Sequence, residues 1–216
     1  MNMDLSKKTS FNRNKINDKC VFDTAEDNVL KDFYIPILKD SVSYDGAVGF
    51  FSTYGLLRIL QGIEGLVKNK GKMRLLIGKP LTEEEYKVFE SKGNYENILL
   101  KWNSDWIELF NQQFTNINQY RLEIFSWLLR NNFLEIKYAA RRNGMYHKKI
   151  GILKDGDGEV VVFSGSINLT NNALTSHSSN PDGNSEEFSV YPSWEKDEFK
   201  RHGKAKIEYF NKVWNG

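Results

Sequence analysis

The stretch HKKIGILKDGDGEVVVFSGSINLT, residues 147–170, decides how this chain folds. Apolar residues on both sides of the sequence DGDGE predict two strands, at 145–153 and 160–166, joined by a tight turn into a β-hairpin. Because side chains alternate along a strand, His147 and Lys149 are expected on one face and Lys148 on the other. The hairpin therefore predicts one surface that carries the side chains of the His-x-Lys and Ser-x-Asn pairs.

The residue types on this surface suit an anion site. A histidine beside a lysine can supply a nucleophile or a proton shuttle next to a positive charge. Ser166 and Asn168 can both donate hydrogen bonds to phosphate oxygens, and Gly165 would let the backbone approach a ligand closely. The pattern indicates a site for phosphate chemistry.

A carboxylate follows further along the chain. The segment EEFSVYP, residues 186–192, alternates as a strand does. Glu186 would orient a histidine ring, as the carboxylate of a catalytic triad does. Glu187 is the competing residue, and we prefer Glu186 because alternation places it on the face of Phe188 and Val190.

The rest of the chain alternates helices and strands, which predicts an α/β fold with a mixed sheet. A strand ending at Ser52 and a strand at 72–78 would pair in parallel through a helix at 54–69. That helix shows an apolar stripe of Leu56, Leu60, Ile63 and Val67 and ends at Gly71. The remaining expected elements are helices at 25–40, 95–132 and 194–214 and a strand at 133–140, with a capping box formed by Thr82 and Glu85 and with Trp102, Trp106 and Trp127 in the core.

Composition limits the class of protein. The chain has 216 residues, 40% hydrophobic and 13% aromatic, which fits one ordinary domain at 21–216 after a flexible N-terminal segment at 1–20. A net charge of +2 does not by itself indicate a nucleic-acid partner. The single cysteine, Cys20, allows no internal disulfide and suits the cytoplasm. The sequence has neither an apolar leader nor a long apolar run, so no membrane partner is expected.

The order His-x-Lys, Gly-Ser-x-Asn and then a glutamate resembles the phospholipase D superfamily. The segment DGAVGFFSTYGLLRILQGIEGLVKNKGKMRLLIG also looks like the opening of the phospholipase D-like domains found in some bacterial helicases and restriction enzymes. The resemblance covers roughly residues 20–192 and implies a mixed sheet flanked by helices on both faces. The family's aspartate is replaced by Lys154, and the next residue, Asp155, is expected to shape the turn.

The resemblance implies a mechanism without metal or cofactor. His147 would attack phosphorus and form a phosphohistidine, while Lys149 and Asn168 would bind the nonbridging oxygens. Ser166 would add a hydrogen bond, and Glu186 would hold the imidazole in the right tautomer. The substrate implied is nucleic acid, and we favour DNA over RNA.

The family's site needs two histidines, and this chain holds one copy of the motif. His177 has no lysine two residues later, and His202 is followed by Lys204 but by no Gly-Ser-x-Asn, so a homodimer would have to bring two copies of His147 together. Arg141 and Arg142 are candidates to grip a phosphate backbone, although a solvated turn explains them equally well.

Three functions remain open from the sequence. The first is a nuclease, serving restriction or defence or forming part of a larger helicase-like protein. The second is a phospholipase D-like module that binds DNA and dimerises without useful turnover. The third, a lipid phosphodiesterase, is disfavoured because no amphipathic helix with a basic face and exposed aromatics is expected.

Overall fold

The computed structural model of the protein describes residues 9–17, 19–80, 116–141, 145–175 and 183–216. Its strands are β1 (Val21–Asp23), β2 (Ser41–Val48), β3 (Lys72–Pro80), β4 (Leu134–Arg141), β5 (Ile150–Asp155), β6 (Val160–Gly165) and β7 (Glu187–Pro192). Its helices are α1 (Arg13–Asn17), η1 (Leu30–Tyr34), α2 (Ile35–Lys39), α3 (Thr53–Arg58), α4 (Leu60–Lys68), α7 (Asn116–Arg130), α8 (Lys196–Glu198), η2 (Phe199–Gly203) and α9 (Lys204–Asn215), where η marks a π-helical turn.

The described strands form one mixed sheet in the order β1-β7-β6-β5-β2-β3-β4. β2, β3 and β4 run parallel, as expected for strands linked by helical crossovers. β5, β6, β7 and β1 each pair antiparallel with their neighbours, and β5 joins the two halves by pairing antiparallel with β2. The predicted hairpin at DGDGE and the predicted parallel pair around the helix at 54–69 are both confirmed.

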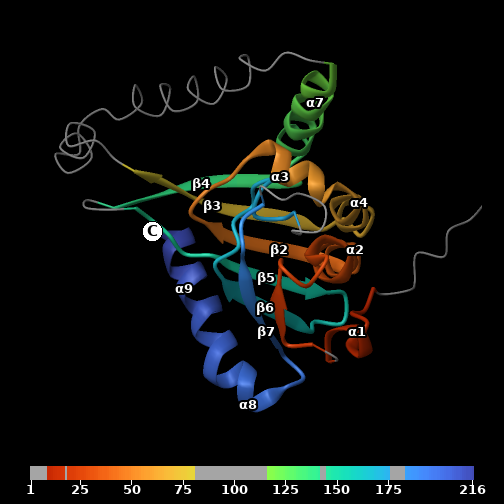
Figure 1. Cartoon of the computed structure of the whole chain (residues 1–216), viewed down its shortest axis with the longest axis vertical. Coiled ribbons are helices and arrows are strands. Elements are labelled where there is room, and N and C mark those ends of the chain that lie inside the picture. Colours follow the sequence, from red (N-terminus) through yellow and green to blue (C-terminus); the bar gives the residue numbers. More distant parts are fainter. Residues whose placement is uncertain (1–8, 18, 81–115, 142–144, 176–182) are drawn as a thin grey trace, which may run out of the picture.

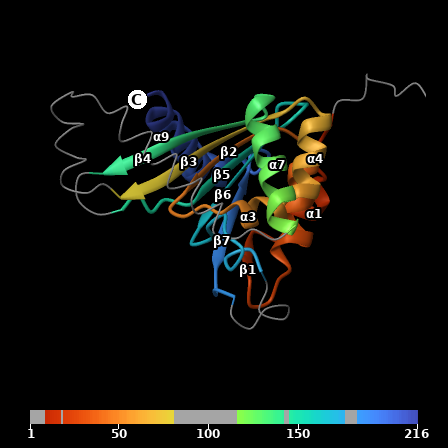
Figure 2. The same cartoon turned by 90° about the horizontal axis from the view of Figure 1, so that it is seen from above.

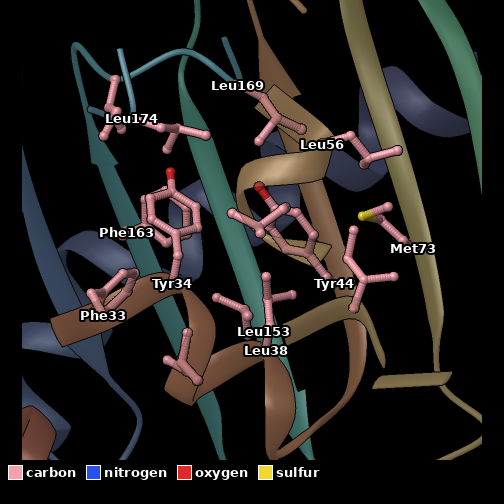
Figure 3. Packing of buried hydrophobic residues seen from close by; sticks show 14 of the residues in the cluster. Phe33, Tyr34, Leu38, Tyr44, Leu56, Met73, Leu153, Phe163, Leu169 and Leu174 are labelled. Carbon is pink, nitrogen blue, oxygen red and sulfur yellow. The ribbon is translucent and has the colours of Figure 1, made fainter. Parts of the chain in front are cut away.

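Helices cover both faces of the sheet (Figures 1 and 2). Alternation along the strands divides the core accordingly: Val161 and Phe163 of β6 face one cluster, and Val162 between them faces the other. The larger cluster packs against η1, α2, α3 and α4, and Figure 3 shows part of it around Tyr34 and Tyr44. The smaller cluster packs under α9. The predicted fold class, a mixed α/β sheet flanked by helices on both faces, is confirmed.

The N-terminal segment differs from the expectation of a flexible lead-in at 1–20. Residues 1–8 and 18 lie outside the described part, but Phe11 and Ile16 are buried in the larger core cluster. The Phe11 backbone N–H donates to a carboxylate oxygen of Asp155 at 2.9 Å. Two apolar side chains and one buried hydrogen bond thus attach this segment to the domain.

The helix predicted at 54–69 is two helices, α3 and α4, separated at Ile59. The side chains that enter the core are Leu56, Ile59, Ile63 and Leu66 rather than the predicted stripe of Leu56, Leu60, Ile63 and Val67, because the break shifts the helical phase. At the C-terminal end of α4 the left-handed residue is Lys70, at φ 56°, instead of Gly71. The Gly71 N–H donates to the Leu66 carbonyl at 2.8 Å, which completes the capping motif.

Other expected elements change their bounds. β2 ends at Val48, not at Ser52, and the helix expected at 25–40 is η1 followed by α2, with Pro36 in the first turn of α2. The helix at 194–214 is present as α8, η2 and α9. Residues 170–174, after the bridge of Leu169 with Phe51, form bends and turns.

The tryptophans were expected in the core. Trp127 on α7 is instead 48% exposed and stacks on Phe133 at 5.4 Å between ring centroids. Trp102 and Trp106 lie outside the described residues, as does the capping box of Thr82 and Glu85. Within the described residues, no helix is both long and apolar enough to cross a bilayer.

Candidate active site

The four residues predicted to be catalytic lie at one end of the sheet. His147 and Lys149 lie just before β5, Asn168 lies just after β6, and Glu186 immediately precedes β7. Because these strands alternate in direction, the start of β5, the end of β6 and the start of β7 lie at the same end of the sheet. The end of β2 lies at this end of the sheet too, since Ala47 pairs with Ile150.

His147 and Lys149 were predicted to share the face of a strand, but residues 145–149 form no regular strand. Both side chains nevertheless reach one point, Gly49. A Cβ atom at Gly49 would lie 3.0 Å from His147 Cδ2 and 3.2 Å from Lys149 Nζ. Lys148 points away and lies over the Tyr209 ring of α9, at 5.3 Å from its centroid. The structure therefore brings His147 and Lys149 together, through a different local conformation.

Their environments differ. The His147 side chain is exposed, whereas Lys149 is buried at 6% exposure and donates to the His147 carbonyl at 3.1 Å. Burial lowers the pKa of Lys149 from its ordinary value, and the carboxylate of Glu186 opposes that shift. A desolvated ammonium next to an accessible imidazole can bind an anion more strongly than a solvated one could.

Asn168 is held by the backbone that follows β2. Its Oδ1 accepts a hydrogen bond from the Phe50 N–H at 3.0 Å, and its side chain is nearly buried at 9% exposure. Next to it, Leu169 bridges Phe51 and accepts a hydrogen bond from the Ser52 N–H at 3.0 Å. With its oxygen engaged in this way, the amide NH₂ of Asn168 is the group left to donate to a ligand oxygen.

Glu186 is buried at 7% exposure and Glu187 is exposed, so burial separates the two candidates in favour of Glu186. Its Oε1 accepts from Asn184 Nδ2 at 3.0 Å. Fully buried Thr24, just after β1, fixes the backbone here: its hydroxyl accepts from the Glu186 N–H and donates to the Asn184 carbonyl, both at 2.9 Å. The described hydrogen bonds of Glu186 do not include one from His147, and its effect on Lys149 is electrostatic.

Ser166 and Gly165 have structural contacts of their own. The Ser166 hydroxyl accepts from the Glu187 N–H at 3.1 Å, which continues the pairing of β6 with β7. A Cβ at Gly165 would lie 2.0 Å from the Glu187 carbonyl oxygen, so the close approach of the strands requires glycine there. Phosphate binding by these two residues stays a prediction.

Asp155 lies at the far end of β5, roughly 17 Å along the strand from Ile150 at 3.3 Å per residue, and so away from His147 and Lys149. It is buried at 2% exposure. Its carboxylate accepts hydrogen bonds from the backbone N–H groups of Phe11, Asp157 and Glu159, at 2.9, 3.0 and 2.9 Å. These contacts shape the turn and hold the N-terminal segment.

Two predicted residues cannot be placed on this site. Arg141 ends β4, where only its backbone is described, and Arg142 lies outside the described residues, as does His177. His202 lies on η2 and stacks on Tyr191 at 5.1 Å. In the described part of the chain, no three His, Cys, Asp or Glu side chains gather as a metal site would need.

Sequence reasoning missed three residues that build the site: Gly49, Phe50 and Thr24. The strand was expected to continue through Phe50, which would have buried its side chain, yet that side chain is 53% exposed. The available signal in the sequence was a glycine followed by two aromatic residues, Gly49–Phe51, at the end of an apolar run. Thr24 carried no signal, because its partners lie 160 and 162 residues away.

Comparison with known proteins adds little. No protein-family model matches the chain, and no curated protein matches it. Among solved structures, the chain is similar to one described as a crystal structure of polyphosphate kinase from Porphyromonas gingivalis, with a TM-score of 0.42 and 12% sequence identity. The match covers 81% of this chain and 23% of that chain.

Proposed function

We propose that the protein is a metal-independent phosphodiesterase that cleaves nucleic acid through a phosphohistidine intermediate. The observation that carries the proposal is the convergence of an exposed His147 and a buried Lys149 on Gly49, with Asn168 bound to the next residue. A nucleophile, a cation and an amide donor close to one glycine are the groups that phosphoryl transfer requires.

In the first step an imidazole nitrogen of His147 attacks phosphorus, and the bond from phosphorus to the leaving oxygen breaks. That oxygen takes a proton from a second imidazole. In the next step water attacks phosphorus, the second imidazole takes the water's proton, the bond from phosphorus to the His147 nitrogen breaks, and a phosphomonoester leaves. Lys149 and the Asn168 amide stabilise the charge on the nonbridging oxygens in both steps.

The second imidazole is His147 of another copy of the chain, so the proposal includes a homodimer with the two sites facing across a two-fold axis. Glu186 supports the site by keeping Lys149 protonated against the effect of burial. The proposal also includes a triad-like contact between Glu186 and a histidine ring, and this contact would form only in a complex of two copies.

The test is cleavage of plasmid and single-stranded DNA in excess EDTA. We expect the wild-type protein to cut at least one of these two substrates and His147→Ala to cut neither. His202→Ala is the matched control, because His202 stacks on Tyr191 away from the site. Mixed dimers of wild type and His147→Ala should also lose activity, since each reaction uses both histidines.

Two outcomes would contradict the proposal. DNA that is bound in a gel shift but left intact by the wild-type protein would favour a binding and dimerisation module. Full activity in a protein that sediments as a monomer at micromolar concentration would exclude the shared site.

A further inference from the structure

Phe50 stands at the rim of the candidate site. It follows Gly49 at the end of β2, and its side chain is 53% exposed, whereas Val48 two residues earlier is buried at 4%. Single exposed apolar residues are common on protein surfaces and carry no meaning alone. The contacts of Phe50 set it apart from such residues.

Its position is fixed on two sides. The Phe50 backbone N–H donates to Asn168 Oδ1 at 3.0 Å, so the backbone at Phe50 cannot shift without releasing Asn168. The Phe50 ring lies 6.3 Å from the His147 ring between centroids, at an interplanar angle of 86°. This edge-to-face pair is a favourable aromatic arrangement that still leaves half of the Phe50 surface open to solvent.

We propose that Phe50 stacks on the nucleobase next to the phosphate under attack, so that the substrate presents unpaired bases at the site. The inference rests on the proposed function and names the class of nucleic acid. A base inside a duplex has its faces covered by neighbouring base pairs, so a protein ring can stack on it only after it is unpaired. Stacking accepts every base, so it selects single strands without selecting sequence.

The geometry supports this occupant. A phosphate held by Lys149 and Asn168 lies beside Phe50, because Lys149 Nζ lies next to Gly49 and Asn168 Oδ1 accepts the hydrogen bond of the Phe50 N–H. A nucleotide bound by its phosphate therefore has its base within reach of the ring. An apolar shield for His147 would not need an aromatic ring, and a leucine would serve equally well.

The test compares two ligands, a short oligothymidylate and the same sugar-phosphate chain without bases, in the wild type, Phe50→Leu and Phe50→Trp. Leucine keeps the apolar bulk and removes the π face, and at an exposed position it should not alter folding, which thermal melting checks. Dissociation constants are measured by fluorescence anisotropy in the His147→Ala background, or in the wild-type protein if it proves unable to cleave. The inference can thus be tested even if the proposed function fails.

We expect the wild type to bind the strand with bases about fivefold to a hundredfold more tightly than the strand without, the range that one stacked base covers. Phe50→Leu should lose this difference and leave binding of the baseless chain unchanged, and Phe50→Trp should retain it. Cleavage of single-stranded DNA should fall in Phe50→Leu by a similar factor.

Three results would overturn the inference while the nuclease proposal stands. The first is equal weakening of both ligands by Phe50→Leu. The second is dissociation of the dimer by the same substitution, which would make Phe50 an interface residue. The third is a wild-type enzyme that cuts duplex DNA as well as single strands. Absence of any cleavage by the wild type, with base-dependent binding that needs Phe50, would overturn only the proposed function.

Discussion

Replacing Gly49 by alanine is the sharpest test of the site's geometry. The new methyl carbon would lie 3.0 Å from His147 Cδ2, 3.2 Å from Lys149 Nζ and 3.3 Å from the Tyr146 carbonyl oxygen. Non-bonded carbon atoms settle at about 3.5–4.0 Å, so His147 must give way by a few tenths of an ångström, up to about 0.5 Å. The φ angle of Gly49 is not positive, so the backbone itself accepts alanine.

A displacement of this size matters for catalysis more than for folding. Catalytic groups must be held within about 0.5 Å of their productive positions, and a 1 Å displacement can cost about a hundredfold in rate. We therefore expect Gly49→Ala to lower kcat/KM about tenfold, equivalent to about 1.4 kcal/mol of transition-state stabilisation. The free energy of unfolding should change by less than about 1 kcal/mol, because exposed His147 can move toward solvent.

The assay is steady-state cleavage of single-stranded DNA in EDTA, with urea denaturation of the same preparations. Gly46→Ala is the matched control three residues earlier, within β2, where a Cβ would lie 2.8 Å from Leu75 Cδ2 and 3.0 Å from the Tyr44 hydroxyl, inside the core. It should destabilise the fold and leave kcat/KM of the folded protein near wild type. Unchanged kcat/KM in Gly49→Ala would refute the idea that His147 and Lys149 act together at this glycine.

Two further substitutions separate the electrostatic and structural carboxylates. Glu186→Gln should move the alkaline limb of the kcat/KM profile to lower pH, because Lys149 acts in its protonated form and the Glu186 carboxylate raises the pKa of Lys149, which burial has lowered from 10.5. The control, exposed Glu187→Gln, should leave that limb in place. A shift in both variants would contradict the assignment. Asp155→Asn should lower the free energy of unfolding, measured by urea titration, by about 2–3 kcal/mol. The reason is that a buried carboxylate that accepts three backbone N–H bonds, one of them from Phe11, loses its charge. Loss of kcat/KM in the folded variant would instead give Asp155 a part in catalysis.

Much of the fold could be predicted because its signals are local. Alternation and turn residues defined the β5–β6 hairpin and β7, and the apolar runs before and after the helix at 54–69 defined β2 and β3. The errors arose where the cause lies elsewhere in the molecule. Phe11 and Ile16 read as a polar tail in the sequence, and only the distant acceptor Asp155 and the core beneath them reveal their burial.

The candidate site could also be predicted only in part: the sequence indicated its residues, but not the contacts that hold them together. His147, Lys149, Asn168 and Glu186 could be named from motif order, but the reason given for their meeting, alternation along one strand, does not hold for residues 145–149. What brings His147, Lys149 and Asn168 together is the segment just after β2, about a hundred residues earlier, where Gly49 has no side chain to keep His147 and Lys149 away and the next backbone N–H orients the amide of Asn168. Such a contact depends on the pairing of β2 with β5, which no local pattern specifies. The motif order therefore predicts the candidate chemical groups, whereas the order of the strands determines that they lie next to Gly49 and that exposed Phe50 lies beside His147.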